Sequence, residues 1–582
     1  MLGIKSYYKI ITETKKVTVI RKRENMKILI IAINAKYIHS NLGIYDLQSY
    51  ANAYKEHLQL AEFTINQSVD EIVSAIYKER ADVLCLSCYI WNREYVERVA
   101  TILHKILPKL PIWLGGPEVS YQAEKEIGYW PQIKGIMVGE GEETFLELVR
   151  TYVEKTYNFE AIAGLVFKED EKVVVTKARL PINLSSIPFP YYDKIEDFQH
   201  KIIYYESSRG CPFSCSYCLS SVDKRLRFRD LSLVKEELQF FIDHEVEQVK
   251  FVDRTFNCNH KHAIEIWKYL LEHDRGRTNF HFEVAADIMT EEEIELIGKM
   301  RPGLIQLEIG VQTTNLKTLD EIKRKMDFEK VARVVKRIQE KQNVHQHLDL
   351  IAGLPFENYS SFAKSFNEVY QLKPNQLQLG FLKVLKGSYM HFMAEAYECV
   401  YHPYPTYEVL ETKWISYEEL LSLKQIEEMV EVYYNSGQFL NTIDYLVTNY
   451  CKRGKDYTPF LFYSHLGEYY EKKSYNKVSH SRIKRYDILL DFVKEEIPFL
   501  ENNLVDYMMM DLYLRENLKS RPSFAPSIES FKQRIKNWYK KEGKRQDSKS
   551  HVEYLFGDWY LFDYERRDKL SYNAFVQKIE VE

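Results

Sequence analysis

The chain has 582 residues, too many for one hydrophobic core, so several domains are expected. The formal net charge is −4, from 80 Lys and Arg against 84 Asp and Glu, which is not the general basic character of a nucleic-acid-binding protein. Eight cysteines in so long a chain exclude a disulfide framework and favour a reducing, cytoplasmic location, and no apolar run reaches the ~18–20 residues of a membrane span.

The first domain is expected at residues 26–155, after a basic extension (1–25) that is predicted to be disordered. Short apolar runs alternate here with helical patterns, including a helix from Leu42 to about His57. Strands are predicted at 27–33, around Phe63, and at 82–88, 111–115 and 135–138. This α/β alternation predicts a doubly wound, Rossmann-like parallel sheet.

A second alternating series follows a hairpin and linker at 156–200. Its strands are predicted at 202–206, 248–252, 280–285, 304–310, 345–352 and 376–383. Six βα units of this length predict a partial (β/α)6 version of the TIM barrel over residues 201–390. Residues 391–582 are charged, aromatic and helical in pattern, and they predict a separate α-rich domain.

Three cysteines lie together in the loop after the first of these strands. In RGCPFSCSYC (209–218) they are Cys211, Cys215 and Cys218. A [4Fe–4S] cluster usually takes four thiolates, so three leave one iron for a non-protein ligand, like the open position of a catalytic zinc site. The alternatives are a zinc knuckle or three cysteines that lie together by chance. Zinc would normally need a fourth Cys or His ligand, and the next histidine, His244, is at the far end of a predicted helix. We therefore expect a cluster.

The C-x3-C-x2-C spacing, with an aromatic residue before the last cysteine, resembles the signature of the radical-SAM superfamily. The resemblance implies that S-adenosylmethionine (SAM) binds the open iron and is cleaved to methionine and a 5′-deoxyadenosyl radical. It also implies functional residues at later strand ends, where the alternative for each is a structural role inside the barrel. The catalytic candidates are Glu283 and Glu308, and the SAM-binding candidates are Tyr217, Asp253, Arg254, Gly310, Gln312 and Gly353.

The first domain has characteristic loops after its strands, among them NAKYIHSNLG, GGPEVS and VGEGEETF. A dinucleotide G-x-G-x-x-G is absent after its first strand, so NAD is not expected. The loops resemble those of the cobalamin-binding domain that precedes many radical-SAM cores. That resemblance implies a nucleotide-tail site lined by Ser87, Gly115, Gly116, Gly139 and Gly141. The D-x-H-x-x-G pattern of an axial histidine is absent, although His39 lies in the corresponding loop; a ligand-free domain of the same fold is the alternative.

The two resemblances cover about residues 27–385 and imply a cobalamin-dependent radical-SAM enzyme. It would transfer a methyl group to an unactivated carbon of a small-molecule substrate, or catalyse a rearrangement, with electrons from a flavodoxin or ferredoxin. The C-terminal domain resembles a helical extension of certain members and is expected to close the barrel or select the substrate.

Two other functions are weighed against this one. A tRNA methylthiotransferase would need three cluster cysteines in its first domain and a basic β-barrel at its end. A cobalamin or iron–sulfur sensor would not turn over SAM. Nucleic-acid binding is supported only by a short basic stretch between Lys532 and Lys549, for which a solvated surface is the simpler interpretation.

Overall fold

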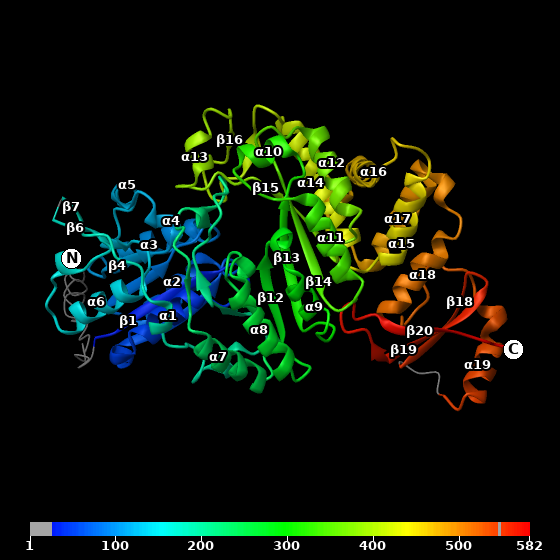
Figure 1. The fold of residues 1–582 in the computed structure, drawn as a ribbon, viewed down its shortest axis with the longest axis horizontal. Helices are drawn as coiled ribbons and strands as arrows, with labels where there is room; N and C mark the ends of the chain where they lie inside the picture. Colours follow the sequence, from blue (N-terminus) through cyan, green and yellow to red (C-terminus); the bar gives the residue numbers. More distant parts are fainter. Residues whose placement is uncertain (1–25, 171, 545–548) are drawn as a thin grey trace, which may run out of the picture.

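Figure 1 shows the computed structural model, which describes residues 26–170, 172–544 and 549–582. The basic extension predicted at 1–25 lies outside these residues. Three parts follow one another along the long axis of the molecule: an N-terminal α/β part, a central barrel-like sheet and a C-terminal part (Figure 1). Within the described ranges, none of the helices has the length and apolar character needed to cross a bilayer.

The N-terminal part is a seven-stranded sheet in the order β2-β1-β3-β4-β5-β6-β7. Its first five strands are parallel, which confirms the predicted doubly wound fold. They are β1 (Ile28–Asn34), β2 (Leu58–Thr64), β3 (Val83–Ser87), β4 (Ile112–Gly115) and β5 (Gly135–Met137). Helices α1 (Leu42–Tyr50) and α6 (Glu142–Val153) cover one face, and α2 (Val69–Glu79) and α3 (Arg93–Ile106) cover the other. Because both faces are covered, all of β1 is buried.

The hairpin predicted as part of the linker belongs to this first sheet. Strands β6 (Leu165–Glu169) and β7 (Lys172–Val175) extend it in antiparallel orientation beyond β5. Leu165, Val166 and Phe167 are buried, so the hairpin contributes to the core of the domain. The segment that joins the two α/β parts is therefore shorter than the 156–200 expected from the sequence.

The central sheet has six parallel strands in the order β8-β11-β12-β13-β14-β15, which confirms the predicted partial barrel. The strands are β8 (Ile203–Tyr205), β11 (Gln248–Phe251), β12 (Asn279–Val284), β13 (Ile305–Gln312), β14 (His345–Ala352) and β15 (Gln376–Phe381). Its helices include α7 (Leu231–Asp243), α8 (His260–His273), α9 (Glu291–Ile297), α10 (Leu316–Glu321), α11 (Phe328–Gln339) and α12 (Tyr359–Tyr370). Between β8 and α7, the short strands β9 (Ser208–Arg209) and β10 (Arg227–Phe228) pair as a separate ribbon.

An open barrel has two edge strands, and each is hydrogen-bonded by a neighbouring part of the chain. At β15, the Asn435 side chain donates to the carbonyl of Leu377 and accepts from its amide, both at 2.9 Å. At β8, the Ile202 amide donates to the carbonyl of Ile38 (2.7 Å), and the Ser40 hydroxyl donates to the carbonyl of Ile202 (2.9 Å). The edges are thus protected from pairing with other chains.

The C-terminal part is mainly helical, but it ends in a sheet that the sequence did not lead us to expect. Its main helices are α14 (Tyr417–Val430), α15 (Leu440–Cys451), α16 (Pro459–Lys472), α17 (Arg482–Glu496) and α18 (Leu504–Arg515). The antiparallel strands β18 (Ser550–Leu555), β19 (Asp558–Arg567) and β20 (Ala574–Ile579) follow helix α19 (Lys532–Lys541).

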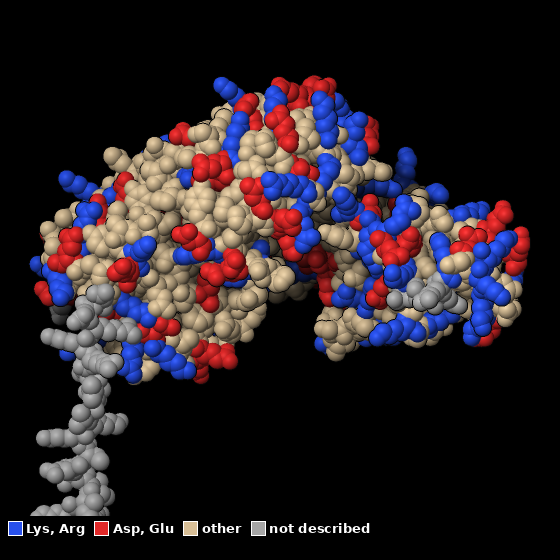
Figure 2. Space-filling model, turned by 90° about the horizontal axis from the view of Figure 1, so that it is seen from below, with Lys and Arg blue, Asp and Glu red and all other residues tan. Residues whose placement is uncertain are grey.

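The basic stretch of the sequence falls largely on α19. This helix buries Ile535, Trp538 and Tyr539 among residues of the terminal sheet and leaves most of its lysines exposed. Acidic and basic side chains are interspersed over the face drawn in Figure 2. The stretch therefore has the character of a solvated helix surface.

Candidate active site between the two α/β domains

The three cysteines of the motif line one cavity of about 230 Å³, which we call the cluster cavity. They lie on the loop between β9 and β10; Cys211 and Cys215 are buried and Cys218 is half-buried. Gly210 begins this loop at φ +99°, where a Cβ would lie 2.4 Å from the carbonyl oxygen of Arg225. Glycine is therefore required where the loop leaves the ribbon.

Three thiols facing one cavity fit a cubane cluster with one open iron. Burial raises the pKa of the Cys211 thiol, so deprotonation has to be driven by metal binding. The Arg324 guanidinium lies 3.5 Å from the sulfur of Cys215 and adds a positive charge beside the thiolates.

Most of the predicted SAM-binding residues line the same cavity. The structure brings together Tyr217, Arg254, Gly310 and Gln312 there, along with the two catalytic candidates, Glu283 and Glu308. Gln312 has φ +71° and follows a register shift in β13, and its side-chain oxygen is buried without a hydrogen-bond partner. A buried acceptor of this kind is available to a donor on a ligand. Arg324, which the sequence analysis missed, also donates to the Tyr217 hydroxyl (3.4 Å) and to the carbonyl of Gly310.

Two further residues predicted to contact SAM, Asp253 and Gly353, have close structural neighbours elsewhere in the protein. Asp253 is fully buried and does not line the cluster cavity. Its carboxylate accepts hydrogen bonds from the Ser207 amide (3.0 Å), the Ser207 hydroxyl (2.7 Å) and the Ser208 hydroxyl (2.6 Å), just before the cysteine loop. Gly353 has φ +86°, and a Cβ there would lie 2.6 Å from Val409 of the C-terminal part. Both residues thus have structural neighbours within the protein, and their contact with SAM stays a prediction.

The two candidate catalytic carboxylates have opposite electrostatic environments. Glu308 accepts from Lys250 (3.0 Å) and lies 3.1 Å from the His281 ring nitrogen. Burial alone would raise its pKa, but the His281 hydrogen bond and the Lys250 charge lower it to about 2. Burial, followed by the Glu308 charge, raises the pKa of Glu283 to about 7. Glu283 has no hydrogen bond or ion pair with any described residue, and so it can exchange a proton near neutral pH.

Strand β14 also places polar side chains in the interior of the barrel. On β14, His347 lies 2.9 Å from Asp349, and Asp349 lines the cluster cavity. Branched apolar residues fill the interior of a typical parallel barrel, so this interior is unusually hydrophilic. The alternation HQHLDL on β14, with polar residues at every second position, could have indicated it.

A second cavity of about 510 Å³ lies at the carboxyl ends of the N-terminal strands, and we call it the glycine-lined cavity. It is lined by all five residues predicted for the nucleotide tail: Ser87, Gly115, Gly116, Gly139 and Gly141. The Ser87 hydroxyl is buried without a hydrogen-bond partner. Gly116 has φ +116°, and a Cβ there would lie 2.5 Å from the carbonyl oxygen of Cys88. Exposed glycine backbone and an unpaired Ser87 hydroxyl along one cavity fit the binding of a cofactor.

A central cavity of about 530 Å³ lies between the two α/β domains. It shares Arg254 and Glu283 with the cluster cavity. It shares Asn41, Gly43, Tyr89, Glu142 and Arg209 with the glycine-lined cavity. The three cavities therefore adjoin one another.

His39 lines the central cavity, not the glycine-lined one. Its Nδ1 lies 2.7 Å from the Tyr204 hydroxyl, which fixes the orientation of the ring. Burial lowers the pKa of His39 and keeps the ring neutral, the form in which histidine binds metals.

Comparisons with known proteins divide the chain in the same way. Residues 28–149 match the B12 binding domain, residues 205–369 match the radical SAM superfamily, and residues 395–556 match DUF4080, described as a protein of unknown function. The first two matches confirm the predicted cofactors: a [4Fe–4S] cluster, SAM and cobalamin.

Curated relatives match part of the chain. The cobalamin-dependent radical SAM methyltransferase TokK of Streptomyces tokunonensis is 28% identical over 299 residues, which are 48% of this chain and 44% of TokK. The 2-(S-pantetheinyl)-carbapenam-3-carboxylate methyltransferase of Streptantibioticus cattleyicolor is 27% identical over 301 residues, with the same coverage of each chain. The matched segments thus span less than half of either relative.

A solved structure extends the likeness in fold. The cobalamin-dependent S-adenosylmethionine radical enzyme OxsB with aqua-cobalamin bound superposes with a TM-score of 0.59 at 14% identity, over 90% of this chain and 82% of OxsB. The fold and the domain matches agree with the cavities described above. Within the chain, residues 205–369 thus match the radical SAM superfamily, and residues 28–149, which precede them, match the B12 binding domain.

Proposed function

We propose that this chain is a cobalamin-dependent radical-SAM enzyme that transfers a methyl group to an unactivated carbon of a small-molecule substrate. The observation that carries the proposal is the continuity of the three cavities, with Arg254 and Glu283 at the junction between the cluster and central cavities. Both reacting cofactors have to face the same substrate carbon, and adjoining cavities allow this. The methyltransferase relatives support the reaction type.

Named residues can be given roles in this reaction. When bound, the cluster supplies the electron that cleaves SAM, and cobalamin supplies the methyl group. Cys211, Cys215 and Cys218 would hold the cluster. Arg324 would offer a fixed positive charge beside it, and the unsatisfied Gln312 oxygen would be free to accept from SAM. In the glycine-lined cavity, Ser87 and the glycines would hold the cobalamin tail.

The substrate is inferred to be polar where it enters the barrel. Lys250, Glu308 and Asp349 line the cavities that face the junction. A hydrocarbon placed against these side chains would leave charged groups buried and unsolvated, which is costly. Glu283, with its pKa of about 7, lines both the cluster and the central cavity and can accept or return a proton at their junction.

SAM cleavage tests this proposal. Protein reconstituted anaerobically with iron and sulfide, then reduced with dithionite, should convert SAM to 5′-deoxyadenosine, as measured by chromatography. A variant with all three motif cysteines changed to alanine is the control and should form none. Absence of the product from iron-loaded wild-type protein would favour the sensor alternative. Hydroxocobalamin absorbance retained through gel filtration should confirm the second cofactor.

A tRNA methylthiotransferase would need three cluster cysteines in its first domain and a basic β-barrel at its end, and the described residues favour neither of these features. The cysteines described in the N-terminal domain are Cys85 and Cys88, both buried, and burial raises the pKa of each thiol. The C-terminal part consists mainly of helices, with a two-stranded ribbon of β16 (Val400–Tyr401) and β17 (Val409–Glu411) and one open three-stranded sheet. Mixed charge on the face in Figure 2 offers no continuous track for a phosphate backbone.

The electron donor is inferred to be a small acidic protein, such as a flavodoxin or ferredoxin. Lys224, Arg225 and Lys325 are exposed beside the cluster loop, and Lys325 also lines the cluster cavity. Complementary charge chiefly raises association rates. The double variant K224E/K325E should slow reduction by flavodoxin about tenfold at low salt, while reduction by dithionite stays unchanged. Equal effects on both reductants would contradict this docking surface.

A further inference from the structure

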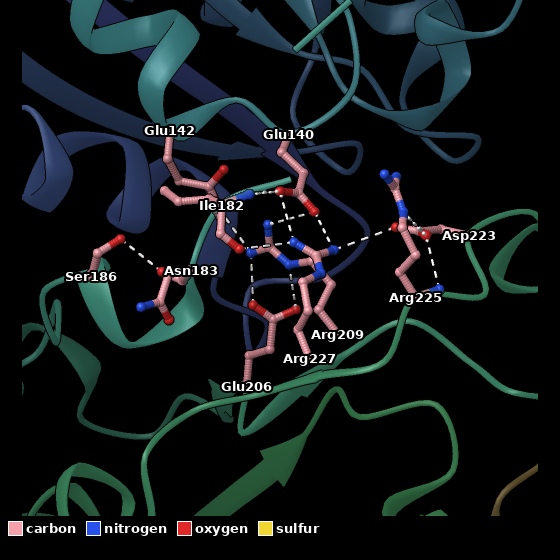
Figure 3. Close-up of polar contacts among 10 residues, drawn as sticks. All are labelled: Glu140, Glu142, Ile182, Asn183, Ser186, Glu206, Arg209, Asp223, Arg225 and Arg227. Carbon is pink, nitrogen blue, oxygen red and sulfur yellow. Dashed lines mark hydrogen bonds and ion pairs between the residues drawn. The ribbon is translucent and has the colours of Figure 1, made fainter. Parts of the chain in front are cut away.

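Four charged side chains connect the junction between β5 and α6 of the first domain to the ribbon that carries the cysteine loop (Figure 3). Arg209 and Arg227 are opposite each other on β9 and β10. Arg209 contacts Glu142 at 2.8 Å and Glu140 at 3.5 Å, and Arg227 donates to Glu140 at 3.0 Å. We call these four side chains the interdomain clasp.

The clasp is held from both sides. Arg209 also donates twice to Glu206 at the end of β8, at 2.9 and 2.7 Å. Glu140 accepts from the Ile182 amide (2.8 Å), and Arg227 donates to the carbonyl of the same residue (3.0 Å). The clasp side chains are between 7% and 21% exposed, so solvent screens them less than surface ion pairs.

The clasp forms a wall of the glycine-lined cavity. Glu140, Glu142 and Arg209 line that cavity, together with Leu219 and Asp223 from the segment directly after Cys218. One oxygen of Glu142 accepts from Arg209, whereas the other is buried without a hydrogen-bond partner. A buried free acceptor in a cofactor cavity suits an amide donor, and cobalamin carries amide side chains on its ring.

We infer that cobalamin and the iron–sulfur cluster bind cooperatively, and that the contact between Arg209 and Glu142 couples them. A ligand that fixes Glu142 and the wall after Cys218 also fixes the loop that presents the cysteines. By linkage, each cofactor must then strengthen binding of the other by the same factor. This inference rests on the proposed placement of the two cofactors and adds an energetic connection between their sites.

The coupling factor is measurable without substrate or turnover. The Kd for hydroxocobalamin, from absorbance after equilibrium dialysis under anaerobic conditions, is compared between cluster-loaded and iron-free full-length protein. We expect cluster loading to tighten binding about tenfold, within the usual range of coupling between sites. A ratio of one in the wild type would overturn the inference on its own, whatever the variants do.

Two matched variants assign the coupling to the clasp. Glu142→Gln keeps the size of the side chain but removes its charge, and the ratio should fall toward one. Glu143→Gln is the control, because Glu143 is the next residue of α6, pairs with Arg179 (3.1 Å) and does not line the cavity; its ratio should stay at the wild-type value. Equal ratios in wild type and E142Q would refute the role of the clasp.

A spectroscopic measurement separates this inference from the proposed function. The electron paramagnetic resonance signal of the reduced cluster should change when cobalamin is added to wild type, and should change less in E142Q. If neither iron nor cobalamin binds at all, the proposed function fails. If both bind but independently, only the cooperative coupling fails.

Discussion

Replacing Asp253 with alanine distinguishes a contact with SAM from a structural role behind the cysteine loop. The side chain is fully buried and accepts three hydrogen bonds from Ser207 and Ser208. Hydrogen bonds to a charged group contribute ~1.5–3 kcal/mol each. Burial raises the pKa of Asp253 to about 6, which shows that desolvation offsets part of this gain. We therefore expect D253A to lose about 3–5 kcal/mol, less than the sum of the three bonds.

The assay measures three quantities separately: the unfolding temperature, the iron content per chain and the binding of SAM. D253A should unfold at lower temperature and retain less iron per chain after reconstitution, while the molecules that keep a cluster still bind SAM. Ser208→Ala is the graded control, because it removes one of the three bonds and should cost about 1–2 kcal/mol. Wild-type stability and iron content in D253A, combined with lost SAM binding, would refute the structural role.

Three further predictions concern residues that line the three cavities. Gly116→Ala should cost about 3 kcal/mol, because at φ +116° its Cβ would lie 2.5 Å from a backbone oxygen, whereas Gly139→Ala, at φ +83° with nothing within 4 Å, should cost about 1 kcal/mol. Thermal unfolding compares the two, and equal losses would contradict the steric argument. Lys250→Met and Glu308→Gln should each cost about 1–3 kcal/mol, since about a quarter of each side chain is exposed, and the double variant should cost less than their sum. Additive losses would mean that the pair is not coupled. The raised pKa of Glu283 means that its folded form binds a proton more tightly than the unfolded chain, so wild-type stability falls as pH rises from about 4.5 to about 7. Glu283→Gln cannot ionise and should gain stability relative to wild type between pH 5 and pH 8; a constant difference would contradict the raised pKa.

Both strand series could be read from the sequence because parallel strands covered on both faces are nearly continuous apolar runs. The run KILIIAI predicted β1 to within one residue at each end. Six later apolar runs predicted the six strands of the partial barrel. The cysteine spacing gave the position of the cluster loop for a similar reason, since the signal is local. Elements whose evidence lies within about ten residues were therefore predicted well.

The features that could not be predicted from the sequence depend on contacts between residues that are far apart in the chain. The apolar pattern of β6 was visible, but its pairing with β5 was not. Asp253 and Gly353 follow strands as expected, yet their surroundings are set by Ser207 and by Val409. Arg324 reaches the cysteine loop across 109 residues of chain, and a single sequence offers no signal for that contact.

The partial barrel gains a cavity by remaining open, and in return it has two edges that need partners. The edge at β8 is bonded by the loop of residues 38–40, which comes from the B12-binding domain and also contains His39. The opposite edge is bonded by Asn435, from the C-terminal part. Consequently, the docking that satisfies the β8 edge is the same docking that places the glycine-lined cavity against the cluster cavity. The relative position of the two cofactor sites is then fixed by backbone hydrogen bonds as well as by the interdomain clasp, so a shift of the B12-binding domain would have to break both.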